Sequence, residues 1–231
     1  MMDAHTVFST RRHLPLAGLS LLLLASSALA QAPNPGQMAD AYATGAKANA
    51  QLMQKYTWKM RVQLTYKGEE KPAQLYQMNY VGGQLQKTLL SAPADDKGRG
   101  IRGKVKENKM DEIKAEVEAL VDLTKKYMAP TPGQMFDFYS KATIAPGPGG
   151  VQASGANFIQ PGDKVTYTID PATKSPTSFN FTTSLSGKPV TGTATYAQVP
   201  GGPKYASTMT INDPTDNLSV AVTNFEYQLN Q

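Results

Sequence analysis

The most regular pattern in the chain is a strict alternation of apolar and polar residues over 56–66. Thr57, Lys59, Arg61, Gln63 and Thr65 separate the apolar positions, which are Tyr56, Trp58, Met60, Val62, Leu64 and Tyr66. A period of two predicts a β-strand with one buried and one solvated face. The alternation continues at Tyr76, Met78 and Tyr80, and Gly82-Gly83 predicts a tight turn into a third strand at 85–91. We therefore expect a three-stranded meander.

Short alternating segments return in the last third of the chain. Turn residues separate them at Asp170-Pro171, Ser186-Gly187, Gly201-Gly202 and Asp213-Pro214. This spacing predicts five further antiparallel strands, at 165–169, 179–183, 190–199, 205–211 and 218–227. The Pro- and Gly-rich stretch 145–150 before them predicts a loop, and no Gly-Lys-Ser or Gly-Lys-Thr follows to make it a phosphate-binding loop.

Three segments have a helical period. Asn34-Pro35 provides an N-cap and a first-turn proline for a helix with a weak apolar stripe that Asn49 interrupts. A second helix is predicted from Asn108 to just before Pro130, with its stripe at Met110, Ile113, Val117, Leu120, Val121 and Met128. Thr131 and Gln134 form a capping box that opens a short third helix through Met135, Phe136 and Tyr139.

The first thirty residues predict a cleaved export signal. Arg11 and Arg12 precede an apolar run over 14–25, and Ala28-Leu29-Ala30 is a small-x-small cleavage site. The apolar core is about a dozen residues, against the roughly 20 that a membrane-spanning helix needs. Residues 10–14 also resemble a twin-arginine motif, so both export routes stay open. We expect residues 31–231 to form one exported domain, in the periplasm or outside the cell.

Removal of this leader changes the available chemistry. Both histidines, His5 and His13, lie within it, and the chain has no cysteine, so no zinc site of the common kinds remains. The chain holds 23 Lys and Arg against 18 Asp and Glu; without Arg11, Arg12 and Asp3 the remainder is 21 against 17, a net charge of +4. This mild excess allows contact with anionic membrane surfaces, and we expect no nucleic-acid partner.

Catalysis and metal binding are not expected, although two alternatives stay open. The acidic turn at 212–217 has oxygen donors for calcium but lacks EF-hand spacing, so a hairpin turn is favoured there. A hydrolase could use paired carboxylates alone. The pairs lie in predicted turns or at a helix start, where solvated charge is the ordinary explanation: Glu69-Glu70, Asp95-Asp96 and Asp111-Glu112. We predict no cofactor.

A basic segment over 97–109 admits two interpretations. One is a binding loop for an anionic group or a partner protein, and the other, which we favour, is a solvated connection, since no aromatic residues are interleaved with the charges. Two glycines, Gly98 and Gly100, loosen the chain around it. The basic residues are Lys97, Arg99, Arg102, Lys104, Lys106 and Lys109.

The order of these elements resembles that of the LolA-like superfamily, the periplasmic carriers of outer-membrane lipoproteins. The nearest local likeness is the strand-turn-strand segment over 165–179, in which Val165-Thr-Tyr-Thr-Ile runs into an Asp-Pro turn and the chain returns through Ser-Phe179. The resemblance implies an α+β fold: a strongly curved antiparallel sheet of about 8–10 strands, an unclosed half-barrel. An N-terminal helix and a two-helix insertion at about 109–141 would pack on its concave face.

The resemblance further implies a non-catalytic binding or carrier protein for an apolar or lipid-like ligand, or a lipoprotein, in the cell envelope. We expect a monomer. Arg61 falls on the opposite face from Trp58, so it does not match the functional arginine of the best-known carriers. The alternative is an envelope interaction module that uses strand edges or the basic segment 97–109. The expected ligand-binding residues are Tyr56, Trp58, Met60, Val62, Leu64, Tyr76, Met78, Val117, Leu120 and Phe136. The resemblance implies that these residues line a hydrophobic cavity for acyl chains between the sheet and the helices.

Overall fold

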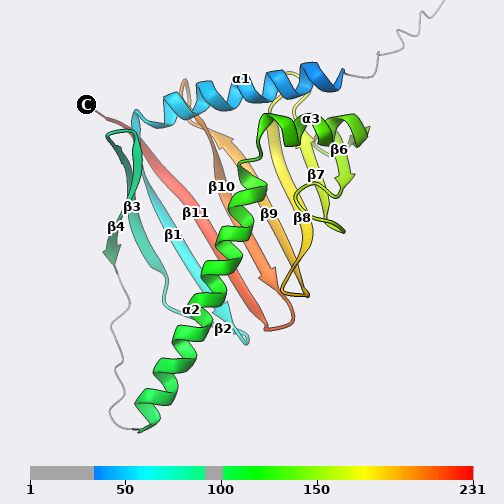
Figure 1. Cartoon of the computed structure of the whole chain (residues 1–231). Coiled ribbons are helices and arrows are strands. Elements are labelled where there is room, and N and C mark those ends of the chain that lie inside the picture. The colour runs from blue at the N-terminus through cyan, green and yellow to red at the C-terminus, as the bar shows by residue number, and fades with distance from the viewer. Residues whose placement is uncertain (1–33, 92–100, 231) are drawn as a thin grey trace, which may run out of the picture. The chain divides into compact units, whose positions relative to one another are not determined.

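The computed structural model describes residues 34–91 and 101–230, and for 101–111 it describes the backbone alone. Within these ranges the chain forms three helices and an eleven-stranded sheet (Figure 1). The helices are α1 (Pro35–Met53), α2 (Ile101–Met128) and α3 (Pro132–Lys141). The strands are β1 (Tyr56–Tyr66), β2 (Glu69–Glu70), β3 (Gln74–Val81), β4 (Gln84–Ser91), β5 (Thr143–Gly147), β6 (Gly150–Ala156), β7 (Lys164–Ile169), β8 (Pro176–Leu185), β9 (Lys188–Gln198), β10 (Lys204–Asp213) and β11 (Leu218–Leu229).

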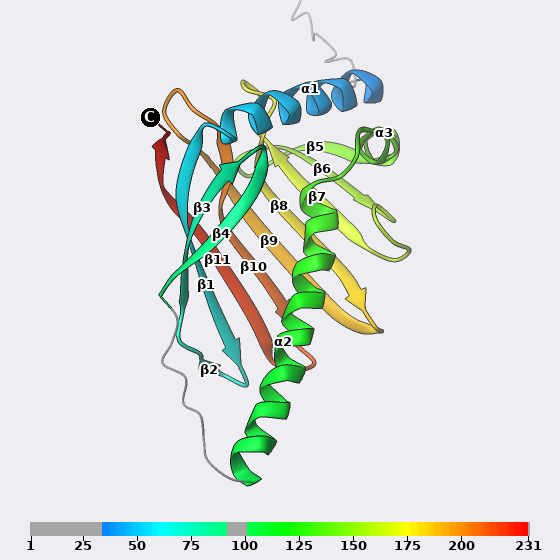
Figure 2. The same cartoon turned by 60° about the vertical axis from the view of Figure 1, so that its left-hand side comes forward.

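The sheet is antiparallel and does not close. Its order is β4-β3-β1-β11-β10-β9-β8-β7-β6-β5, with β2 added to β1, so β4 and β5 are the edges. The two predicted meanders are joined by β1 and β11, which pair from Tyr56 opposite Leu229 to Tyr66 opposite Leu218. The α+β half-barrel expected from the sequence is confirmed, and the sheet curves around the side on which the helices lie (Figure 2).

The predicted loop at 145–150 is wrong, because this stretch belongs to a β-hairpin. β5 and β6 pair from Thr143 opposite Ser154 to Gly147 opposite Gly150. Proline lacks the N–H that an interior strand needs, but it is tolerated at a sheet edge. Pro146 lies in β5, which is such an edge. Together with β2, this hairpin brings the strand number above the expected 8–10.

The turn and cap chemistry predicted from the sequence is confirmed. Gly82 and Gly83 both have positive φ, at 59° and 79°, as a two-residue hairpin turn requires. The Asn34 side chain accepts hydrogen bonds from the backbone N–H groups of Gly36 and Gln37 at the start of α1. Thr131 and Gln134 form the capping box of α3. Local sequence therefore determines where these elements begin.

Helix α2 begins earlier than predicted, at Ile101 instead of about 108. The basic segment 97–109 is therefore not a loop over 101–109, and the insertion spans 101–141 instead of 109–141. Charged residues are good helix formers, so a run of them permits a solvated helix as readily as a loop. Lys97 and Arg99 lie outside the described residues, as does the predicted export signal.

Asn49, the residue that interrupts the apolar stripe of α1, fixes this helix to the sheet. Its Nδ2 donates to the carbonyl oxygen of Lys204 at 2.8 Å, and its Oδ1 accepts from the Lys204 N–H at 2.7 Å. The side chain thus satisfies both backbone groups of one residue of β10, as a neighbouring strand would. At its other end α1 packs on α3, where Ala39 is buried.

The main core lies between the helices and the inner face of the sheet. Tyr127 of α2 stacks on Phe181 of β8, with ring centroids 4.3 Å apart. Phe138 of α3 meets Tyr167 of β7 edge to face at 5.5 Å. The buried cluster takes side chains from all three helices and from β6 to β11. Among the described helices, none is long and apolar enough to cross a membrane.

Close packing of Phe181 against β9 predicts the effect of enlarging Gly192. A Cβ at this position would lie 2.1 Å from Cε1 of Phe181. We expect Gly192→Ala to lower the free energy of unfolding by about 1–3 kcal/mol, because the ring must move out of its stack on Tyr127. Urea denaturation measures the change.

The matched control is Gly45→Ala in α1, where an added Cβ meets no atom within 4 Å. Alanine is favoured over glycine inside a helix by roughly 0.5–1 kcal/mol, so this variant should be as stable as the parent or more so. Equal urea midpoints for Gly192→Ala and the parent would contradict the packing described here.

Candidate ligand-binding face

The inner face of the sheet continues beyond the helix-covered core onto β1, β3 and β4. Strand register places Val62 opposite Val222 and Leu64 opposite Val220, and Val220 lies opposite the core residue Ile211. Side chains paired across a ladder point to the same face. The apolar positions of β1 therefore share the face on which the helices lie, as the alternation predicted.

Among the side chains that the structure describes, packing against the helix-covered core ends within β1. Leu64 and Tyr66 still pack against the buried cluster, whereas Met60 and Val62 are half-buried and do not belong to it. On β3 the side chains of Tyr76 and Tyr80 are also half-buried. Beyond them, at the edge of the sheet, Leu85 and Leu89 of β4 are 52% and 47% exposed. We call Met60, Val62, Tyr76, Tyr80, Leu85 and Leu89 the open strip.

The open strip lies beside two buried residues, Trp58 and Met78, which face each other across β1 and β3. The indole ring of Trp58 stacks nearly parallel on Tyr227 at 5.3 Å, and its Nε1–H donates to Oδ1 of Asn224 at 3.2 Å. Asn224 in turn donates to the carbonyl oxygen of Ala206 at 2.9 Å. These contacts fix the orientation of the indole ring, so the residues of the strip next to Trp58 lie against a well-packed side chain.

The structure gathers six of the ten expected site residues on one surface. Met60 pairs with Tyr76 and Trp58 with Met78 across β1 and β3, and Val62 and Leu64 continue the same face along β1. Tyr56 lies at the start of β1, and its hydroxyl approaches the β9–β10 turn at Gly202.

The three expected helical residues lie elsewhere. Leu120 is fully buried in the main core, and Val117 is half-buried against it. Phe136 is 48% exposed on α3, beside Gly36 at the start of α1.

Leu85 and Leu89 were not expected as site residues, although the sequence holds a signal for them. Strand register places Leu85 opposite Tyr80 and Leu89 opposite Tyr76. The alternation read in β3 thus continues through the Gly82-Gly83 turn into β4. Sequence reasoning identified the strand but could not decide that helices leave this part of the face uncovered.

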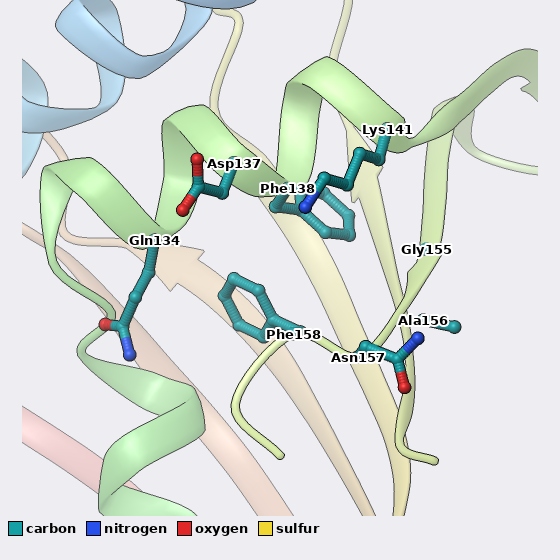
Figure 3. Close-up of a pocket in the computed structure, with 8 residues that line it drawn as sticks. All are labelled: Gln134, Asp137, Phe138, Lys141, Gly155, Ala156, Asn157 and Phe158. Atoms are coloured by element: carbon teal, nitrogen blue, oxygen red, sulfur yellow. The ribbon is translucent and has the colours of Figure 1, made fainter. Parts of the chain in front are cut away.

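One small hollow lies between α3 and the β6–β7 connection, on the helix-covered face near the β5 edge of the sheet (Figure 3). Its volume is about 20 Å³, which is room for one water molecule. Phe138 and Phe158 meet edge to face beside it, with centroids 5.2 Å apart. The hollow is too small for an acyl chain, so it is not a candidate for lipid binding.

Asp163 is a buried carboxylate near the helices, and its contacts fix the conformation of the β6–β7 loop. Its oxygens accept backbone N–H groups from Phe158, Ile159 and Gln160 at 2.6–3.0 Å. The Tyr127 hydroxyl donates to it at 2.9 Å, while lying 2.8 Å from the Thr183 hydroxyl. Burial, foremost, raises the pKa of Tyr127. The network links α2 to the β6–β7 loop.

A second acidic group, Glu116, Asp213 and Asp216, has carboxylate oxygens within 4.8 Å of one another. The Lys188 ammonium lies 2.9 Å from Glu116 and also contacts Asp216. The Asp213 side chain accepts from the backbone N–H groups of Thr215 and Asp216, as in an Asx turn. The predicted hairpin turn at 212–217 is therefore stabilised by hydrogen bonds from its own backbone to Asp213. Lys188 supplies a positive charge among the three acids.

Of the paired carboxylates considered for a hydrolase, the structure describes the side chains of Glu69, Glu70 and Glu112. Glu69 and Glu70 are exposed on β2, and a hydrogen bond from Lys71 lowers the pKa of Glu69. Glu112 is exposed on α2, while Asp95 and Asp96 lie outside the described residues.

Comparison with known proteins gives similarity of fold. No model of a known protein family and no curated protein matches the chain. Solved structures do match. One is an outer membrane lipoprotein-sorting protein domain from Vibrio parahaemolyticus, with 14% identity, coverage of 85% of this chain and 93% of that one, and a TM-score of 0.43. Another is a LolA superfamily protein from Nitrosomonas europaea, with 8% identity, coverage of 87% of this chain and 95% of that one, and a TM-score of 0.35. A DUF1329 family protein from Desulfovibrio piger also matches, with 5% identity, coverage of 85% of this chain and 94% of that one, and a TM-score of 0.38.

The Asp163 network predicts the consequence of removing the Tyr127 hydroxyl. Tyr127→Phe keeps the ring stacked on Phe181 but leaves Thr183 and Asp163 each without one buried partner. We expect the free energy of unfolding to fall by about 1–3 kcal/mol in urea denaturation. Tyr167→Phe is the control, because its hydroxyl makes only a long contact, 3.5 Å, with the Tyr127 carbonyl oxygen. Equal losses in both variants would contradict a special role for the network.

The Lys188 ion pairs predict a pH-dependent effect. Hydrogen bonding to Lys188, foremost, lowers the pKa of Asp216 from 3.8. A lowered folded-state pKa adds stability above pH 3.8, and this stability is lost as the pH falls through the lowered value. We expect Lys188→Met to reduce the melting temperature at pH 7, and the difference from the parent to shrink below about pH 4.

The control for this variant is Lys125→Met. Lys125 pairs with Asp122 at a fully solvated site, where both side chains are 71% exposed. Exposed pairs contribute little to stability, so its melting temperature should stay near that of the parent at both pH values. A loss for Lys188→Met that persists unchanged at pH 3 would show that packing, and not charge, holds α2 there.

Proposed function

We propose that this chain is a non-catalytic binding or carrier protein that holds an apolar, lipid-like ligand on the open strip. One observation supports this above all others: the open strip presents apolar side chains on β1, β3 and β4, and among the described residues of β1 only Leu64 and Tyr66 pack against the helix-covered core. Large contiguous apolar surfaces on soluble proteins usually mark binding sites.

The chemistry of the strip suits a flexible hydrocarbon chain. Its side chains are aliphatic or aromatic, and they follow three neighbouring strands. Each methylene removed from water contributes about 0.8 kcal/mol, so a chain of a dozen carbons laid along the strip has enough apolar surface for stable binding. Trp58 and Met78 are already packed beside it, so less ordering is required when the ligand arrives.

The predicted export signal supports a location for this function outside the cytoplasm. Residues 1–30 have the composition of an export signal, and the remainder has no histidine or cysteine to support the commoner forms of catalysis. We propose that the mature protein acts in the cell envelope, where apolar molecules must cross an aqueous space. The same surface could also bind the acyl chains of a lipoprotein.

A second candidate is strand addition by a partner protein. β4 is an edge of the sheet, and all eight of its residues are exposed. An edge strand with free backbone groups can accept an extended peptide as a further strand. This function would use the backbone of β4, whereas ligand binding would use the inward side chains of β4 and its neighbours.

The open strip predicts the outcome of a matched pair of substitutions. Leu85→Gln and Leu89→Gln together should weaken binding of N-phenyl-1-naphthylamine, an uncharged apolar dye, by about tenfold or more, because each truncation removes apolar contact area. Dye fluorescence measures binding, and quenching of Trp58, the only tryptophan, reports proximity to the strip.

Val81→Gln is the control. Val81 is 50% exposed, like Leu85, but pairs with Gln84 and lies on the opposite face. It should bind the dye as the parent does. Equal dye binding by the parent, the double variant and the control would overturn the proposed site. Native mass spectrometry of the purified protein would further identify a retained ligand.

A further inference from the structure

Lys87 places a positive charge on the open strip. Strand register sets it opposite Met78, and it lies between Leu85 and Leu89 on the inward side of β4. Its ammonium nitrogen lies 4.3 Å from the centroid of the Tyr76 ring, a cation–π contact. The charged group is therefore held over the strip by an inward contact.

Lys87 is the one charged residue among the described inward positions of β1, β3 and β4. On β1, β3 and β4, as far as the structure describes them, the inward positions carry no carboxylate and no other cation. They are Trp58, Met60, Val62, Leu64, Tyr66, Gln74, Tyr76, Met78, Tyr80, Leu85, Lys87 and Leu89. The basic neighbours Lys59 and Arg61 point to the outer face, opposite Phe225 and Thr223.

From this arrangement we infer that the ligand is an amphiphile with a hydrocarbon chain and an anionic head, a carboxylate or a phosphodiester, that pairs with Lys87. The inference rests on the proposed function, because the chain occupies the open strip. An ammonium placed between apolar side chains can pair with the anionic head of an amphiphile while the hydrocarbon chain contacts the neighbouring residues. Tyr76 orients the ammonium before the ligand binds.

An edge strand can also carry an inward lysine for another reason. Such charges discourage edge-to-edge pairing between copies of a protein. This role would require no ligand and would be indifferent to the charge of any molecule bound on the strip. The two roles therefore differ in a measurable way.

Displacement of N-phenyl-1-naphthylamine by dodecanoate, below its micelle concentration, and by dodecanol, below its solubility limit, separates the two roles. The two compounds share a chain length and differ in the charge of the head. We expect Lys87→Gln to shift the ratio of their displacement constants by about tenfold toward the alcohol, while Lys87→Arg retains the parental ratio. Arg61→Gln, which removes one positive charge from the outer face, should also retain it.

A parallel pair distinguishes the two kinds of anionic head. Lysophosphatidylglycerol carries a net negative charge, whereas lysophosphatidylcholine is zwitterionic. A Lys87-dependent preference for dodecanoate alone assigns a carboxylate, and one for lysophosphatidylglycerol assigns a phosphodiester; either supports the inference.

The inference is overturned if the dye binds the strip but Lys87→Gln leaves both ratios unchanged. Unchanged ratios together with stronger aggregation of that variant would assign Lys87 to the prevention of edge-to-edge pairing instead. Failure of the dye to bind the parent would instead overturn the proposed function. Circular dichroism of each variant checks that the fold is retained, and Lys87→Met, which also removes the charge, replaces Lys87→Gln if that variant does not fold.

Discussion

The structure depends on a mismatch between one wide apolar face and the helices available to cover it. Antiparallel pairing continues one inward face of the sheet from β4 to β5. Side chains of the three helices and of this face form the buried cluster over β6 to β11. On β1, β3 and β4 the side chains of the open strip are half-buried or exposed, and apolar surface left in water favours the binding of an apolar molecule.

Polar contacts keep this division in place. Tyr127 and Asp163 attach the end of α2 to the β6–β7 loop, and Lys188 attaches its middle to the strand ends through Glu116 and Asp216. α1 is fixed to β10 by Asn49. Each of these contacts is made to the covered half of the sheet, so none of them involves the open strip.

Much of the fold could be predicted from local patterns. The alternation through Trp58 and Met60, the Gly82-Gly83 turn and the capping box at Thr131 each specify one element, and each is confirmed. The errors share a cause. The stretch 145–150, predicted as a loop, is a hairpin because proline is tolerated in an edge strand. Helix α2 starts at Ile101 because charged residues are tolerated in a solvated helix. Both depend on position in the fold, which local composition does not contain.

The sequence by itself determined which side chains lie on each face, since a strand alternates with a period of two and a helix repeats every 3.6 residues. It also determined where turns and caps form. Only the tertiary structure decided that β1 pairs with β11, that Leu120 is core while Leu85 is exposed, and that Lys87 lies over Tyr76. Those facts depend on contacts between residues far apart in the chain, and on how much surface three helices can cover.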